Sequence, residues 1–302
     1  MRRAPLRALV AAATLATVTT VAGPAEAITD GQLDNGAHPQ VGLMVAQDED
    51  GTPLWRCSGT LVSPTDFITA GHCTSDDAGG SVAGAEVFFG DHYDTNPEFT
   101  AALEAGDPTP CLHGDETSSK KDDYRLSGYP CTGDVSGTPY THPDYDPSRF
   151  WVYDLGVVVL DEPWALPDGH EYASLPEPGQ FDSWTSSTKQ VFTAVGYGLQ
   201  EAYGAGADKD VADKTRMYST PELYSANTPS TGDFNLILSN NTSTGGTCSG
   251  DSGGPNFLGD SLVIAGVTSW GNNANSCGGR SGVYRLDREE DRAWLASVMD
   301  SL

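Results

Sequence analysis

The amino-acid sequence predicts an all-β protein made of two packed β units and a C-terminal helix. Short segments rich in β-branched and aromatic residues recur along the chain, and Gly, Pro, Asn and Asp separate them. Only the last stretch spaces its apolar residues like one face of a helix. The 302 residues are enough to bury one large core or two small ones.

The first 27 residues have the features of a secretory signal peptide. A basic start is followed by a mostly apolar run at 8–21, and Ala25-Glu26-Ala27 has the small-x-small form of a signal-peptidase site. Threonines interrupt the apolar run, which favours a cleaved signal over a membrane anchor. We therefore expect a secreted, extracellular chain, residues 28–302, that has no membrane contact once the signal is removed.

The charge of the chain disfavours two classes of partner. There are 16 Lys and Arg against 42 Asp and Glu, a formal net charge of −26, and loss of three Arg and one Glu with the signal segment makes this −28. Nucleic acids and anionic membranes repel such a protein, so solubility outside the cell is the better explanation of the acidity. The even number of cysteines, six, predicts three disulfides in an exported chain.

Two groups of predicted strands define the two β units. The first unit is expected at about 28–165 and the second at about 180–285, joined by a connection at 166–188 that is rich in Pro, Ser and acids. The predicted strands of the first unit are 41–45, 59–62, 67–70, 86–89 and 155–160, and those of the second include 190–195, 234–238, 262–267 and 282–285.

The C-terminal helix is expected at about 287–300. Asp287 is placed to act as its N-cap, and acids follow in the first turn, where they favour the helix dipole. The apolar residues that share one face are Trp294, Leu295, Val298 and Met299.

The longest irregular stretch, 91–136, is expected to be either a functional loop or a decorative insertion. It contains Cys111 and Cys131, and a disulfide between them would limit its disorder. Its acidic and Asn residues could ligate calcium, but no fixed ligand spacing is visible, so a solvated surface is the better interpretation. We predict no metal and no cofactor.

Ser252 is the candidate nucleophile. It lies in the stretch 247–255, which reads TCSGDSGGP, with glycines on both sides and an acid before it. The glycines allow a tight turn that exposes the hydroxyl and directs backbone N–H groups toward an attacked carbonyl oxygen. A serine hydroxyl is a poor nucleophile until a base removes its proton, so the chain must supply one.

His72 and Asp154 are the candidate base and its partner. His72 follows a predicted strand and precedes Cys73, and its side chain is of the type suited to proton transfer near neutral pH. Asp154 precedes an almost wholly apolar strand, where a charge is costly without a partner. Each of the three residues alone has an ordinary explanation, as a turn serine, a surface histidine or a capped loop aspartate. If His72 is the base, activity falls below about pH 6 to 7.

Three fragments in this order resemble the chymotrypsin-like (trypsin family) serine peptidases: 69–73 (TAGHC), 154–157 (DLGV) and 250–255 (GDSGGP). The order His, Asp, Ser distinguishes that family from subtilisins and α/β-hydrolases. The resemblance implies two six-stranded antiparallel β-barrels with the active site between them. It also implies that Ser252 attacks, His72 transfers the proton, Asp154 orients His72, and the backbone N–H groups of Gly250 and Ser252 form the oxyanion hole.

The resemblance also implies how four cysteines pair. Cys57 and Cys73 match the disulfide of the histidine loop, and Cys248 and Cys277 match the one beside the specificity pocket. The remaining pair, Cys111 and Cys131, has no counterpart in the family. This small cysteine set fits a bacterial-type member.

By the same resemblance, the substrate-binding residues surround Ser252. Gly246 falls at the base of the pocket, where members selective for Arg and Lys carry an aspartate, and Gly271 and Gly282 fall at its walls. The segment Ser269-Trp270-Gly271 matches the one that pairs with the substrate backbone. An open, uncharged pocket favours a large apolar residue before the cut (P1). The alternative is that Arg280 points inward and accepts an acidic P1.

The family is activated by a new N-terminal Ile or Val whose ammonium group pairs with the acid before the catalytic serine. Ile28 directly follows the predicted signal cleavage, and the acid here is Asp251. Removal of the signal would then form the active site. The chain reads ITDG at 28–31 where the family usually reads IVGG, and the alternative is that Ile28 begins an exposed segment.

The sequence therefore predicts a secreted serine endopeptidase that acts as a monomer on polypeptide substrates and is open to proteinaceous inhibitors. The alternative is a catalytically silent homologue that serves as a binding module, with 91–136 as its contact surface. A third reading, an esterase that cuts no peptides, is disfavoured by the segment 269–271, which matches a site for a peptide strand.

Overall fold

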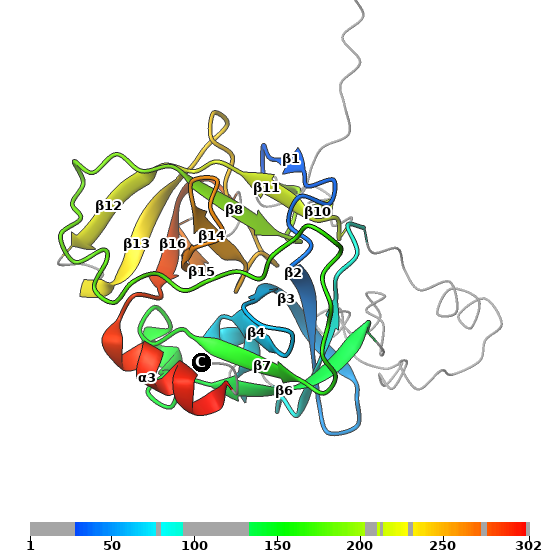
Figure 1. The fold of residues 1–302 in the computed structure, drawn as a ribbon. Helices are drawn as coiled ribbons and strands as arrows, with labels where there is room; N and C mark the ends of the chain where they lie inside the picture. Colours follow the sequence, from blue (N-terminus) through cyan, green and yellow to red (C-terminus); the bar gives the residue numbers. More distant parts are fainter. Residues whose placement is uncertain are drawn as a thin grey trace, which may run out of the picture.

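The structure is a computed structural model that describes residues 28–76, 80–92, 133–202, 210–211, 214–228, 232–272 and 277–299. The expected signal segment 1–27 and the expected Cys111–Cys131 pair lie outside these residues. Figure 1 shows two β units side by side.

The first unit is a closed barrel of six antiparallel strands. They are β2 (Val41–Gln47), β3 (Pro53–Leu61), β4 (Asp66–Thr69), β5 (Gly84–Phe88), β6 (Val135–Thr141) and β7 (Gly156–Leu160), in the order β2-β3-β4-β7-β6-β5. Apolar side chains such as Leu43, Phe67 and Val157 are fully buried in the core, and side chains of these types pack well on a pleated surface.

The second unit is an eight-stranded antiparallel sheet. Its strands are β1 (Gln32–Leu33), β8 (Phe192–Gly196), β11 (Met217–Ser219), β12 (Leu223–Thr228), β13 (Gly232–Asn240), β14 (Pro255–Leu258), β15 (Ile264–Gly271) and β16 (Gly279–Arg285), in the order β1-β11-β8-β14-β15-β16-β13-β12. A bridge between Val191 and Glu222, with a 2.8 Å hydrogen bond from Leu223 N to Gln190 O, joins the entries of β8 and β12. The sheet therefore curls back on itself. A separate pair of short strands, β9 (Glu201–Ala202) and β10 (Asp210–Val211), lies outside it.

A buried arginine joins the two units. Arg216, just before β11, donates from Nη1 to the carbonyl oxygens of Val41 and Phe89 in the first barrel, both at 3.0 Å. Its Nε donates to Asp34 Oδ2 at 2.9 Å. A buried guanidinium is costly unless its donors are satisfied, so this network fixes the first barrel against the second.

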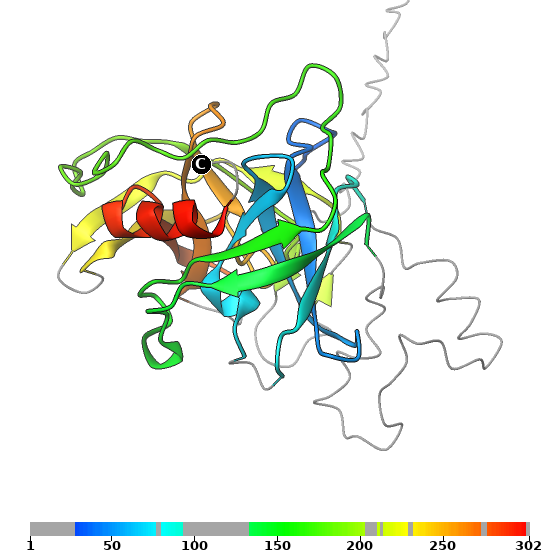
Figure 2. The same cartoon turned by 60° about the horizontal axis from the view of Figure 1, so that its bottom comes forward.

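The C-terminal helix α3 (Glu289–Val298) follows the second unit and packs against β7 of the first (Figure 2). The expected N-cap was wrong: the capping position is Arg288, and it makes no side-chain cap. The carboxylate of Asp287 instead accepts hydrogen bonds from buried Arg285 and from Phe181 N, so it is not available to the helix. The described helices include none that is long and apolar enough to cross a bilayer.

The predicted fold class is confirmed, since the chain is all-β with two barrel-like units and a C-terminal helix. The connection expected at 166–188 contains no strand. Within the described residues, seven strands were not predicted: the two-residue strands β1, β9 and β10, and the longer β6, β11, β12 and β14.

Candidate active site

His72 and Asp154 meet at the edge of the first barrel. His72 lies in the four-residue helix α1 (Gly71–Thr74), directly after β4, and Asp154 lies two residues before β7, which pairs with β4. His72 Nδ1 is 3.0 Å from Asp154 Oδ2, and His72 N donates to Asp154 Oδ1 at 2.8 Å. Asp154 is fully buried, whereas the His72 side chain is 27% exposed. The ring is therefore held through Nδ1 and remains partly exposed to solvent.

Glycine at position 71 allows α1 to pack closely against the backbone that follows Asp154. A Cβ atom at Gly71 would lie 2.9 Å from Leu155 N, tighter than side chains tolerate. Since α1 can approach the backbone after Asp154 only without that atom, the glycine in the fragment TAGHC has a packing role.

The second unit supplies a further hydrogen bond to Asp154. Ser269 Oγ, on β15, donates to Asp154 Oδ2 at 2.5 Å, and Ser269 is buried. The sequence predicted Ser269 as part of the substrate-pairing segment but did not predict this contact of its side chain. The two residues are 115 positions apart, and no local pattern signals the contact.

The loop that carries Ser252 packs directly against the approach to His72. Gly253 has a φ of +78°, and a Cβ atom there would lie 2.0 Å from Thr69 Oγ1 and 2.7 Å from Ala70 N. Ser252 O accepts a 2.7 Å hydrogen bond from Ser58 N on β3. The structure thus brings the serine loop to the same edge of the first barrel as His72 and Asp154.

Two backbone N–H groups of this loop have no acceptor within the described part of the chain. Neither Gly250 N nor Ser252 N donates a hydrogen bond there, although Gly250 O accepts one from Ser58 Oγ at 2.9 Å. Gly250 has a φ of +97°, a conformation that favours glycine. Backbone donors left without partners beside a candidate nucleophile are what an oxyanion hole requires.

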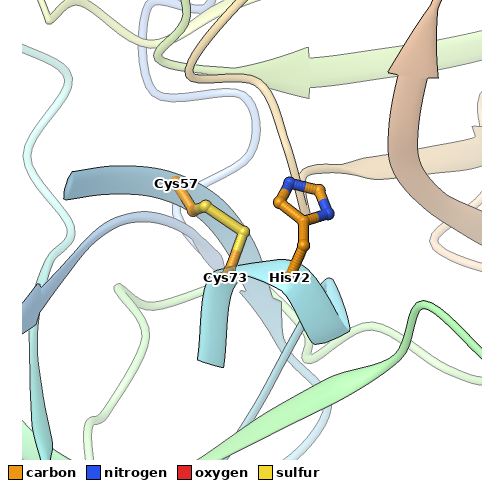
Figure 3. A group of neighbouring side chains, drawn as sticks. All are labelled: Cys57, His72 and Cys73. Carbon is orange, nitrogen blue, oxygen red and sulfur yellow. A yellow bond between two sulfur atoms is a disulfide. The ribbon is translucent and has the colours of Figure 1, made fainter. Parts of the chain in front are cut away.

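The two disulfides expected in the described residues are present. Cys57 pairs with Cys73, and Cys248 pairs with Cys277. Figure 3 shows His72 beside the first of them. Its sulfur atoms are bonded to each other and offer no thiolate, so these three residues do not form a zinc-type ligand set. The Cys57–Cys73 disulfide instead ties α1 to β3.

A cavity of about 110 Å³ opens beside Ser252. Small and polar residues of the second unit line it together with one tryptophan: Asn240, Thr247, Cys248, Ser249, Ser252, Thr268, Ser269, Trp270, Gly271, Cys277 and Gly278. None of these lining residues is charged. Arg280 lies instead with its guanidinium 3.5 Å from the ring centroid of Tyr224 and does not line the cavity.

Asn240 is a cavity residue that the sequence reading missed. A Cβ atom at Gly246 would lie 2.1 Å from Asn240 Oδ1, so the asparagine side chain occupies the space next to Gly246. Asn240 Nδ2 donates to Thr247 O at 2.8 Å and to Ser281 Oγ at 3.2 Å. The cavity is therefore bordered by a fixed neutral amide. Gly246 itself is not among the lining residues.

The two predicted wall glycines differ in their surroundings. A Cβ atom at Gly282 would lie 2.0 Å from the Trp270 indole, so this glycine makes room for the ring. A Cβ atom at Gly271 would have Arg280 O as its nearest neighbour, at 4.0 Å, so a side chain could be accommodated there.

Asp251 and Ile28 are both fully buried. The two carboxylate oxygens of Asp251 accept hydrogen bonds from Cys248 N and Gly198 N, both at 2.8 Å. Burial raises the pKa of Asp251 from 3.8 to about 7, against the opposing effect of these two hydrogen bonds. Ile28 packs against Met217.

The segment after Ile28 is paired with the pocket loop. Thr29 forms an antiparallel bridge with Gly246, and Gly246 N donates to Thr29 O at 3.1 Å. The Thr29 hydroxyl lies 3.2 Å from Cys277 O and donates to it. Ile28 therefore does not begin an exposed segment, since it is buried and followed by paired backbone.

Comparison with known proteins gives consistent results. The structure of HL collagenase is similar, with a TM-score of 0.61, 16% identity, and coverage of 90% of this chain and 100% of that one. Human heparin binding protein gives a TM-score of 0.56, 19% identity, and coverage of 91% of this chain and 98% of that one. At these identities the likeness shows the fold alone. The family model described as Trypsin matches residues 122–286, more than half of the chain. The chain therefore belongs to the trypsin family.

Proposed function

We propose that this chain is a secreted serine endopeptidase in which Ser252 is the nucleophile, His72 the general base and Asp154 the residue that orients it. The main supporting observation is the buried Asp154 carboxylate, which bonds His72 through Nδ1 and the backbone N–H, at the edge where the Ser252 loop packs. A carboxylate at Nδ1 selects the tautomer whose Nε2 can accept the serine proton.

The reaction follows from these positions. Ser252 Oγ attacks the peptide carbonyl carbon while His72 Nε2 takes the hydroxyl proton, and the carbonyl oxygen becomes an oxyanion that the N–H groups of Gly250 and Ser252 stabilise. Each such donor contributes about 3 kcal/mol in other enzymes. The C–N bond then breaks, His72 gives its proton to the leaving amine, and water releases the acyl group by the reverse sequence.

We further propose a large apolar P1 residue, such as Phe, Tyr, Leu or Met. The cavity beside Ser252 is lined by no charged residue, and Arg280 is held over Tyr224 instead. Cleavage of a peptide library tests this: the expected products end in these residues, whereas a dominant preference for Arg, Lys or an acid would contradict it. A library left wholly uncut would contradict the endopeptidase itself.

The second candidate is a catalytically silent binding module. It rests on similarity to a protein whose name describes it as binding heparin. The charge of −26 does not favour a polyanion as ligand for this chain, and the paired His72 and Asp154 favour the enzyme.

We also propose that signal cleavage after Ala27 activates the enzyme, because the new ammonium group of Ile28 would pair with Asp251. Thr29 is already paired with Gly246 in the pocket loop, and Asp251 is buried with a pKa raised to about 7, as expected for a carboxylate that lacks a countercharge in direct contact. One residue added before Ile28 is expected to lower kcat/KM about a hundredfold or more, since an uncompensated buried charge costs several kcal/mol.

A stability measurement gives this prediction a second test. With a folded pKa of about 7 against 3.8, the extended chain holds a proton that the unfolded chain loses, so its stability falls as pH rises from about 4 to about 7. In the chain that begins at Ile28, the ion pair removes this loss. Urea unfolding of both forms, with Ser252→Ala to prevent self-cleavage, is expected to show a gap that widens from about pH 5 to about pH 7. Equal activity and a constant gap would exclude the mechanism.

A further inference from the structure

Arg56 on β3 lies against the serine loop. A Cβ atom at Gly250 would be 2.9 Å from Arg56 Nε and 3.4 Å from Arg56 Nη2, so the guanidinium borders the proposed oxyanion hole. The next residue, Cys57, is tied by its disulfide to Cys73 beside His72. Arg56 is half-buried, so the guanidinium is partly open to solvent.

The Arg56 guanidinium makes no ion pair and no hydrogen bond within the described part of the chain. The two fully buried arginines there do: Arg216 binds Asp34 and Asp91, and Arg285 binds Asp182 and Asp287. Asp251 interacts electrostatically with Arg56 but does not pair with it. Asp251 is fully buried, and both of its carboxylate oxygens accept hydrogen bonds from backbone N–H groups. Arg56 therefore retains donors for an external acceptor.

Arg56 lies on the leaving-group side of the proposed cut. The cavity for the acyl side is lined by residues 240–278 only, and none of its lining residues comes from β3. β3 reaches Ser252 from the first barrel, through the hydrogen bond from Ser58 N to Ser252 O. A substrate whose acyl part fills the cavity must extend its leaving part across Ser252 toward His72, β3 and the Arg56 guanidinium.

The charge of Arg56 acts on other ionisable groups around it. The pKa of Lys214 is lowered, chiefly by burial and then by the charge of Arg56. Cations are few in this chain, which has 16 basic and 42 acidic residues. A carboxylate placed near Arg56 would be attracted to it, because opposite charges attract most strongly where solvent is partly excluded.

We propose that Arg56 binds a carboxylate on the leaving-group side, so that the enzyme prefers polypeptides with Asp or Glu at the first or second residue after the cut (P1′ or P2′). This specificity rests on the proposed peptidase function. It is distinct from P1 selection, which the cavity controls on the other side of Ser252. A planar guanidinium suits this role because it can bind a carboxylate through two parallel hydrogen bonds.

Binding measurements test the proposal without relying on catalysis. The Ser252→Ala variant is titrated with two labelled peptides that are identical except for Glu or Gln at P1′ and P2′. We expect the Glu peptide to bind about fivefold more tightly than the Gln peptide, the size typical of one partly exposed charge pair. The preference should shrink as salt is added. Adding Arg56→Gln is expected to bring the affinity ratio to about one, and Arg56→Glu to invert it.

Arg149→Gln is the matched control, because it removes the same charge at an exposed site paired with Asp146; it is expected to keep the ratio. If Arg56→Gln lowers the affinity for both peptides equally, Arg56 only supports the serine loop and the proposal is wrong. An affinity ratio of one before Arg56 is replaced would also overturn the proposal. In parallel, the wild-type enzyme is given both peptides as substrates. If neither is cut, the peptidase function fails, while the binding ratio still decides the role of Arg56.

Discussion

Replacing Ser252 by Ala is expected to lower kcat for peptide hydrolysis about a millionfold, the size seen when a serine peptidase loses its nucleophile. His72→Ala is expected to cost about as much, and the double variant little more, because the two residues act as one unit. The measurement is kcat for a chromogenic peptide amide, with thermal unfolding to show that each variant is folded.

Additive losses in the double variant would contradict this prediction, since independent contributions would mean that His72 does not serve Ser252. Ser297→Ala is a matched control: this serine is exposed on α3, where its hydroxyl donates only to Trp294 O. It is expected to retain wild-type activity.

Replacing Asp154 by Asn is expected to lower kcat about ten-thousandfold. The amide would present N–H to His72 Nδ1, favour the wrong tautomer and leave Nε2 protonated. Ser269→Ala, which removes the 2.5 Å hydrogen bond to Asp154, is expected to cost much less because both contacts with His72 remain. The pH dependence of kcat/KM separates the two: the loss in Asp154→Asn should decrease at high pH, where hydroxide can assist.

Asp161→Asn is the control for Asp154→Asn, because Asp161 is an exposed aspartate just after the same strand, β7. An Asp154→Asn enzyme that is folded and retains more than about a tenth of wild-type kcat would contradict the assigned role.

The candidate site residues that could be predicted from the sequence lie in short, locally recognisable fragments. His72, Asp154 and Ser252 each occupy such a fragment, and the two disulfides of the described residues followed from the same resemblance. The contacts that the sequence missed depend on pairing between distant strands. Asn240 borders the cavity because β13 carries it next to Gly246.

There are also physical reasons why β6 and β12 were not predicted. β6 contains Gly137 and Pro139, which argue against a strand. The glycine is needed because a Cβ atom at Gly137 would lie 2.6 Å from Val158 Cγ1 and 2.7 Å from Val159 O of β7. The packing of β6 against β7 therefore requires a residue type that is unfavourable in strands, and for this reason the sequence of β6 does not predict a strand. β12 has the polar sequence LYSANT and is fixed mainly by its pairing with β13.

The N-cap of α3 failed for a similar reason. Asp287 has a suitable side chain and position for an N-cap, but its carboxylate is paired with the buried Arg285 instead. Pairing with this guanidinium stabilises the fold more than capping the helix would. An unpaired buried guanidinium costs several kcal/mol, whereas a lost N-cap costs about one.

The most direct test of the central claim is covalent labelling of the purified chain that begins at Ile28 with an organophosphorus reagent directed at activated serines. We predict one adduct per molecule, located by mass spectrometry on Ser252, and its loss in Ser252→Ala and His72→Ala. A correctly folded wild-type chain that never reacts, or that reacts equally well without His72, would contradict the assignment of Ser252 as a nucleophile activated by His72.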